Sequence, residues 1–176
     1  MRQTLVFLAL LNLPLVVGCG SAGESSATAS QEKPINIDGS KFLLAEEPEN
    51  AMGVIEARET AEDGKRLVLV GRIGGSTNPW IEGRAAFMLL DASMSVVEEG
   101  EECEEGEICN GDCCSNERVH CTALVKVVDA EGHLVTIDSR ELLGLTESDM
   151  VVVAGKAKKD ESGNFVMLAN GVYVRR

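Results

Sequence analysis

The amino-acid sequence predicts a mainly β fold: a small Greek-key barrel of five to six strands, with a short helix between strands 3 and 4 and one N-terminal helix. Short runs rich in Val, Leu and Ile recur from residue 66 to the C-terminus, and glycine-containing turn sequences separate them. Only one segment among these runs has the capping residues of a helix. A generic β-sandwich is the alternative, because alternating strands alone do not fix barrel closure.

Residues 34–65 form a predicted N-terminal extension that precedes the barrel. Within it, residues 49–61 place apolar side chains at helical spacing, which predicts one short amphipathic helix. Asn50 is the expected N-terminal cap and Gly64 the expected stop.

The barrel strands are expected from composition and from the turns between them. A turn over 130–132 joins residues 122–129 and 133–138 into a hairpin, which takes the place of the third barrel strand, and residues 160–163 separate the last two strands. A short helix is expected over 139–145, where Asp138 or Ser139 can cap it. The predicted strands are 66–74, 85–91, 122–129, 133–138, 150–158 and 164–174.

The strand sequences also resemble those of a known family. Residues 68–73 (VLVGRI), 87–91 (FMLLD) and 149–155 (DMVVVAG) are similar to exported OB-fold proteins of the bacterial cell envelope. The resemblance covers about residues 66–176 and implies an OB-like barrel that binds a ligand or an envelope protein. It names no ligand, because one fold hosts many functions.

Trp80 is the single tryptophan of the chain and lies in the loop between the first two predicted strands. Loops at this place carry ligands in many OB-folds, so Trp80 is a candidate ligand contact. The alternative is that Trp80 covers the end of the barrel.

The N-terminus has the layout of an export signal. An apolar run over residues 5–17 follows a basic start and precedes Cys19. The run is too short for a transmembrane helix, which needs about 20 apolar residues. Residues 1–18 are therefore the predicted signal peptide.

The sequence Val16-Val17-Gly18-Cys19 resembles the lipobox of bacterial lipoproteins, although Leu is more usual than Val at position 16. The resemblance implies that Cys19 is acylated and anchors the chain to a membrane. Gly20 follows the Cys, and in the family that this segment resembles the absence of Asp there implies the outer rather than the inner membrane. Residues 19–33 then form a lipidated Cys and a flexible tether rich in Gly, Ser and Ala.

The charge of the chain bears on its partners. Asp and Glu number 29 against 16 Lys and Arg, a formal net charge of −13. Nucleic-acid binding depends on basic side chains that release counterions, so no nucleic-acid partner is expected. The membrane, through the lipid, and an unidentified envelope protein or small ligand are the expected partners.

A cysteine-rich insert over residues 96–121 interrupts the predicted barrel. It contains five of the six cysteines and one histidine, and seven glutamates lie between residues 98 and 107. In an oxidising compartment, disulfides are the default, but five cysteines leave one thiol over. Thiolates beside an imidazole also suit Zn, Cu(I) or an iron–sulfur centre. The candidate ligands are Cys103, Cys109, Cys113, Cys114, His120 and Cys121.

The acidic run of the insert has two interpretations. It is either a solvated, self-repelling loop or a means of concentrating cations near the cysteines. Because negative charge disfavours the thiolate, the run argues against a reactive redox nucleophile. No catalytic signature appears in the chain. The leading hypothesis is therefore a non-catalytic, lipid-anchored OB-like binding module whose insert is closed by disulfides or metal. The alternative is a metal-binding or thiol-redox protein that uses Cys109, Cys113, Cys114 and Cys121.

Overall fold

The computed structural model describes residues 37–97, 103–109, 114–161 and 163–176. These belong to one compact unit, Asn36–Arg176. The predicted signal peptide, Cys19 and the tether lie outside the described residues, as does Cys113 of the insert.

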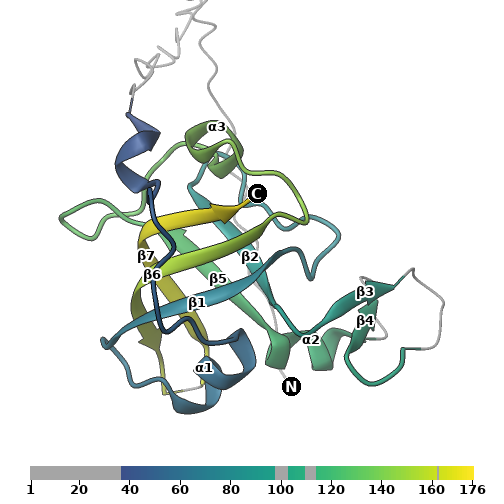
Figure 1. The fold of residues 1–176 in the computed structure, drawn as a ribbon. Helices are drawn as coiled ribbons and strands as arrows, with labels where there is room; N and C mark the ends of the chain where they lie inside the picture. Colours follow the sequence, from purple (N-terminus) through teal and green to yellow (C-terminus); the bar gives the residue numbers. More distant parts are fainter. Residues whose placement is uncertain (1–36, 98–102, 110–113, 162) are drawn as a thin grey trace, which may run out of the picture. The chain divides into compact units, whose positions relative to one another are not determined.

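Five strands close into a barrel in the order β1-β2-β5-β7-β6, and β6 pairs back to β1 (Figure 1). Every neighbouring pair is antiparallel except β5 and β7, which are parallel. This closed five-stranded barrel confirms the predicted mainly β, OB-like fold over the open β-sandwich. The strands are β1 (Arg66–Ile73), β2 (Ala86–Asp91), β5 (Thr122–Val127), β6 (Met150–Lys159) and β7 (Phe165–Arg175).

Two glycines allow the barrel strands to approach closely where they bend. A Cβ on Gly71 of β1 would collide with the carbonyl oxygen of Leu90 in β2, and one on Gly155 of β6 would collide with that of Leu168 in β7. The register of β6 and β7 also shifts next to Gly155. Such bulges bend a strand and increase its twist, which helps a short sheet to close.

The interior of the barrel is a single apolar core built from alternate residues of the strands. Phe87, Leu69 and Met167 come from β2, β1 and β7 and are fully buried. Removing this apolar surface from water is the main source of stability for a domain of this size.

The helix predicted between the third and fourth barrel strands is confirmed as α3 (Ser139–Leu143). The carboxylate of Asp138 accepts a hydrogen bond from the backbone N–H of Arg140 at 2.9 Å, and Gly144 ends the helix in the left-handed conformation.

The predicted strand over 133–138 is wrong, because the segment joins its neighbour only at the isolated bridge between Val128 and Leu134. Its apolar pattern has another cause. Val135 is buried in the barrel core, where its backbone bonds with those of Ala85 and Val127. The alternation therefore reflects a chain that crosses the barrel end on its way to α3.

The N-terminal extension packs on the barrel. It contains the 3-10 helix η1 (Gly39–Phe42), which packs beside β7, and the helix α1 (Val54–Thr60). The latter is shorter than predicted at its start. Asn50 is in the left-handed region, at φ 59°, and does not cap the helix. Gly64 lies beyond the helix end, in the turn to β1.

The insert adds a small two-stranded parallel sheet and a helix beside the barrel (Figure 1). The sheet pairs β3 (Ser95–Val97) with β4 (Glu107–Cys109), and α2 (Ser115–Cys121) leads directly into β5. None of these three elements was predicted. Among the described helices, none has the length and apolar character needed to cross a bilayer.

Candidate metal centre

Three cysteines of the insert come together at one place, each supplied by a different part of it. Cys109 is the last residue of β4, Cys114 is the N-cap residue that precedes α2, and Cys103 lies on the chain leading into β4. The parallel pairing of Val97 with Cys109 fixes the end of β4. The helix α2 fixes Cys114 opposite it.

The sulfur atoms lie in mutual contact distance. The Sγ of Cys114 is 3.2 Å from the Sγ of Cys103 and 3.2 Å from the Sγ of Cys109. All three sulfurs lie within 4.8 Å of one another. No disulfide joins the described cysteines.

Two hydrogen bonds connect Cys109 with Cys114 and with α2. The N–H of Cys109 donates to the Sγ of Cys114 at 3.4 Å, and Nη1 of Arg118 donates to the carbonyl oxygen of Cys109 at 2.9 Å. Arg118 belongs to α2, so this bond ties α2 to β4. Cys109 and Cys114 are buried, whereas Cys103 is exposed. The group therefore has two buried cysteines and one that is exposed to solvent.

The pKa of the Cys103 thiol bears on whether this cysteine is a redox nucleophile. Cys103 is exposed, and its contact with the Cys114 sulfur, together with a smaller desolvation of the thiol, raises the pKa of Cys103 to about 11. A reactive cysteine needs a lowered pKa and a positive setting, because the thiolate is the nucleophile. A bound metal ion removes the thiol proton itself, so a raised pKa does not prevent coordination.

Three converging sulfurs are a ligand set for a soft metal. A disulfide uses two sulfurs about 2.05 Å apart, so one member of the group would always be left over. A single ion at the centre can reach all three at a distance near the about 2.3 Å of a Zn–thiolate bond. Thiolates favour Zn²⁺ and Cu⁺ over hard cations. Cys103, Cys109 and Cys114 are thus the described residues that can hold a metal.

Two further predicted ligands lie apart from this group. Cys121 is buried and its Sγ donates weakly to the carbonyl oxygen of Arg118, at 3.7 Å. It packs with Leu90 and Ile108 in the small apolar cluster that also contains Cys109 and Cys114. Burial raises the pKa of the Cys121 thiol. His120 is exposed and lines a groove beside α1.

Trp80 lies at the end of the barrel and is 9 % exposed. Its ring centroid is 6.3 Å from that of Phe87, and the guanidinium of Arg140 lies 5.5 Å from its centroid on the outer side. Asp138 in turn pairs with Arg140 at 2.7 Å. This is the position of a cover over the core, and a ligand contact by Trp80 stays a prediction.

Asp91 is a buried carboxylate that the sequence did not single out. It ends β2 and accepts hydrogen bonds from the N–H of Ile55 at 2.9 Å and from the hydroxyl of Ser93 at 2.6 Å. Burial alone would raise the pKa of Asp91, but these bonds, with others from the backbone of Ser93 and Val54, hold it below the usual value. Asp91 therefore caps α1 from a distant strand. The aspartate that ends the apolar run FMLLD was the available signal.

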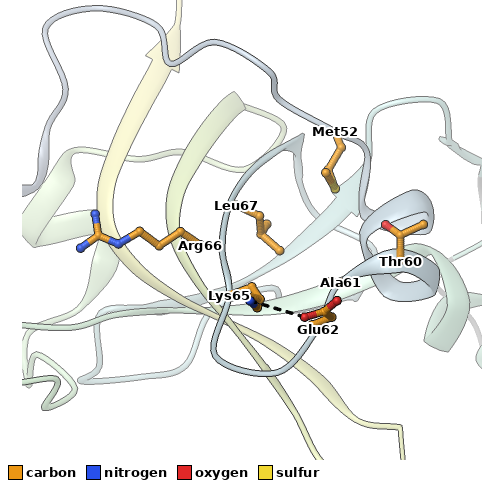
Figure 2. A pocket seen from close by; sticks show the side chains of 7 residues that line it. All are labelled: Met52, Thr60, Ala61, Glu62, Lys65, Arg66 and Leu67. Carbon is orange, nitrogen blue, oxygen red and sulfur yellow. Dashed lines mark ion pairs between the residues drawn. The ribbon is translucent and has the colours of Figure 1, made fainter.

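A shallow hollow elsewhere on the surface lies between α1 and β1 (Figure 2). Lys65 and Glu62 form an ion pair across it at 3.7 Å, and the guanidinium of Arg66 points away from the other lining side chains. It gathers no set of catalytic groups. Its walls are Met52, Thr60, Ala61, Glu62, Lys65, Arg66 and Leu67.

No family model matches the chain, and no curated protein is significantly similar to it in sequence.

Proposed function

We propose that the protein is a non-catalytic, lipid-anchored domain of the cell envelope whose insert is held in shape by one soft metal ion, Zn²⁺ or Cu⁺. The ligands are Cys103, Cys109 and Cys114. The observation that carries the proposal is the convergence of these three sulfurs around Cys114, at 3.2 Å from each of its neighbours.

The composition of the insert supports a structural role for the metal. Among the residues that the structure describes, its apolar cluster has Ile108, three cysteines and Leu90 of β2 as buried members. Small units with so little core usually need disulfides or a metal to fold. The described glutamates Glu104, Glu105 and Glu107 repel one another, and a bound cation offsets that repulsion.

The export and anchoring part of the proposal rests on the sequence. The apolar run over residues 5–17 followed by Val-Gly-Cys supports cleavage before Cys19 and acylation of its sulfur. Mass spectrometry of the native protein tests this directly. We expect an N-terminal acylated Cys19, and a Cys19→Ser variant should be released from the membrane fraction. An intact leader, or an unmodified sulfur at position 19, would contradict the anchor.

Elemental analysis of the purified full-length chain tests the metal. We expect about one zinc or copper ion per chain, because three thiolates bind either metal tightly. The Cys109→Ser/Cys114→Ser double variant should contain none.

Cys121→Ser is the matched control, because it also replaces a buried cysteine of the insert but lies outside the three-sulfur group. It should keep its metal. A metal-free wild-type chain in which these thiols are blocked until a reductant is added would contradict the metal site and favour disulfides.

A further inference from the structure

A second candidate site lies in a groove of about 440 Å³ between α1, α2 and the turn that joins β6 to β7. This volume falls within the about 300 to 1,000 Å³ of small-molecule sites. Its described walls are Ile55, Arg58, Glu59, Val119, His120, Lys159, Gly163 and Asn164. The groove shares none of the three cysteines of the metal centre.

Two cationic side chains, those of Arg58 and Lys159, line this groove. Arg58 and Lys159 are both half-buried, and neither forms an ion pair with a carboxylate of the described residues. The preceding residue of β6, Lys158, is by contrast exposed and forms an ion pair with Asp63. The chain has a net charge of −13, so carboxylates are plentiful, yet none of those described pairs with Arg58 or Lys159.

Neutral contacts hold both cations in place. Nη1 of Arg58 donates to the carbonyl oxygen of Thr122 at 3.2 Å, and its guanidinium lies 6.0 Å from the ring centroid of Phe165. Nζ of Lys159 donates to the carbonyl oxygen of Arg58 at 2.7 Å. Each cation keeps further N–H groups for a ligand. Burial lowers the pKa of Arg58, and an anion in the groove would offset this cost.

The other residues that line the groove indicate which class of anion it can bind. Ile55 and Val119 give the groove apolar sides, and Val119 is 56 % exposed. His120 adds a third nitrogen donor. Glu59 is the one carboxylate among the walls, and the nearby carboxylate of Asp160 is engaged by the backbone and side-chain amides of Asn164.

We propose that this groove binds a phosphate monoester attached to a small apolar group. A phosphate monoester carries about −1.5 to −2 charges and three acceptor oxygens, which suits a guanidinium fork and an ammonium together. A single carboxylate would leave one of the two cations uncompensated. The apolar part of the ligand would lie against Ile55 and Val119. A soluble phosphorylated metabolite and a phosphatidic acid headgroup share this chemistry.

Isothermal titration of the full-length chain with phenyl phosphate, at low ionic strength, tests the proposal. We expect saturable binding that Lys159→Gln weakens about tenfold, the loss of one charge-assisted hydrogen bond. Lys158→Gln is the control, because it removes the same charge from the adjacent position, and it should change the affinity less than about twofold. Thermal melts of both variants show whether each is folded.

The second ligand, short-chain phosphatidic acid, identifies the source. Tighter binding than phenyl phosphate points to a lipid headgroup, and weaker binding points to a soluble ligand. Either result supports the site if it depends on Lys159. The proposal is overturned if neither ligand binds saturably, or if Lys158→Gln and Lys159→Gln weaken binding equally. Because the metal centre uses other residues, a metal-free variant can still bind phenyl phosphate, and the two proposals fail separately.

Discussion

The barrel and the cysteine insert reach a folded state by different means. The barrel closes on itself, so each strand has two neighbours, and its core is filled by large aliphatic and aromatic side chains. The insert has a two-stranded sheet, one helix of two turns and an apolar cluster whose buried members are three cysteines and two aliphatic residues. A core of the first kind is stable through buried area alone. A core of the second kind needs a crosslink or a metal, so we expect the stability of the insert to depend mainly on its cysteines.

The largest effect should come from the barrel core. Phe87→Ala removes a fully buried ring that contacts Trp80, and we expect a loss of about 3 to 5 kcal/mol in the free energy of unfolding. Urea denaturation measures it. Val119→Ala in the insert is the control, since its side chain is 56 % exposed and should change stability by less than about 0.5 kcal/mol. Similar losses in the two variants would break the distinction between the regions.

The next effect concerns the metal. A ligand that binds only the folded state, at 100 times its dissociation constant, stabilises that state by about 2.7 kcal/mol. A strong chelator should therefore lower the melting temperature of the wild type but not that of the Cys109→Ser/Cys114→Ser variant. Differential scanning calorimetry measures both. A barrel transition unmoved by chelator in the wild type would mean that the insert unfolds independently.

Asp91 joins the two regions, and its loss should have a smaller effect. Asp91→Ala leaves the N–H of Ile55 without its acceptor and removes both bonds from Ser93, which lies between β2 and β3. We expect a cost of about 1 to 3 kcal/mol, the usual price of an unsatisfied buried donor. Amide hydrogen exchange should show faster exchange in α1 than in β6. Asp149→Ala, which removes a carboxylate whose hydrogen bond from the N–H of Thr146 is exposed, serves as the comparison, and an equal effect there would argue against the cap.

The smallest effect is a pH dependence that follows from the same residue. The folded pKa of Asp91 lies below the usual value of 3.8, so the carboxylate binds protons more weakly in the folded state than in the unfolded state. Its contribution to stability is complete above the unfolded pKa and is lost as the pH falls through the folded one. Urea midpoints measured on both sides of pH 3.8 should therefore fall more steeply in the wild type than in Asp91→Asn.

The barrel was more predictable than the insert, for a physical reason. Its strands alternate between core and surface, and this alternation appears directly in the sequence as β-branched runs such as residues 66–74 and 150–158. The same signal misled at residues 133–138, where Val135 is buried at the barrel end without belonging to a strand. Alternating hydrophobic residues indicate that every second side chain is buried. Strand pairing is the usual cause of such burial, but it is not required.

The helix α1 shows what local signals miss. Local rules place its cap at Asn50, but the cap comes from Asp91, which follows Ile55 by 36 residues in the chain. Gly53 fits this arrangement, because a Cβ there would lie 2.5 Å from the Asp91 carboxylate. No local pattern contains this contact.

The sequence by itself determined where the five barrel strands lie along the chain, the helix between the third and fourth of them, and the presence of a sulfur-rich insert. These follow from the spacing of residues along the chain. Only the tertiary structure decided that the sulfurs of Cys103, Cys109 and Cys114 converge while that of Cys121 stays outside the group. The reason is that coordination depends on where β4 and α2 meet in space, and residues that share a site through such a meeting carry no fixed spacing in the sequence.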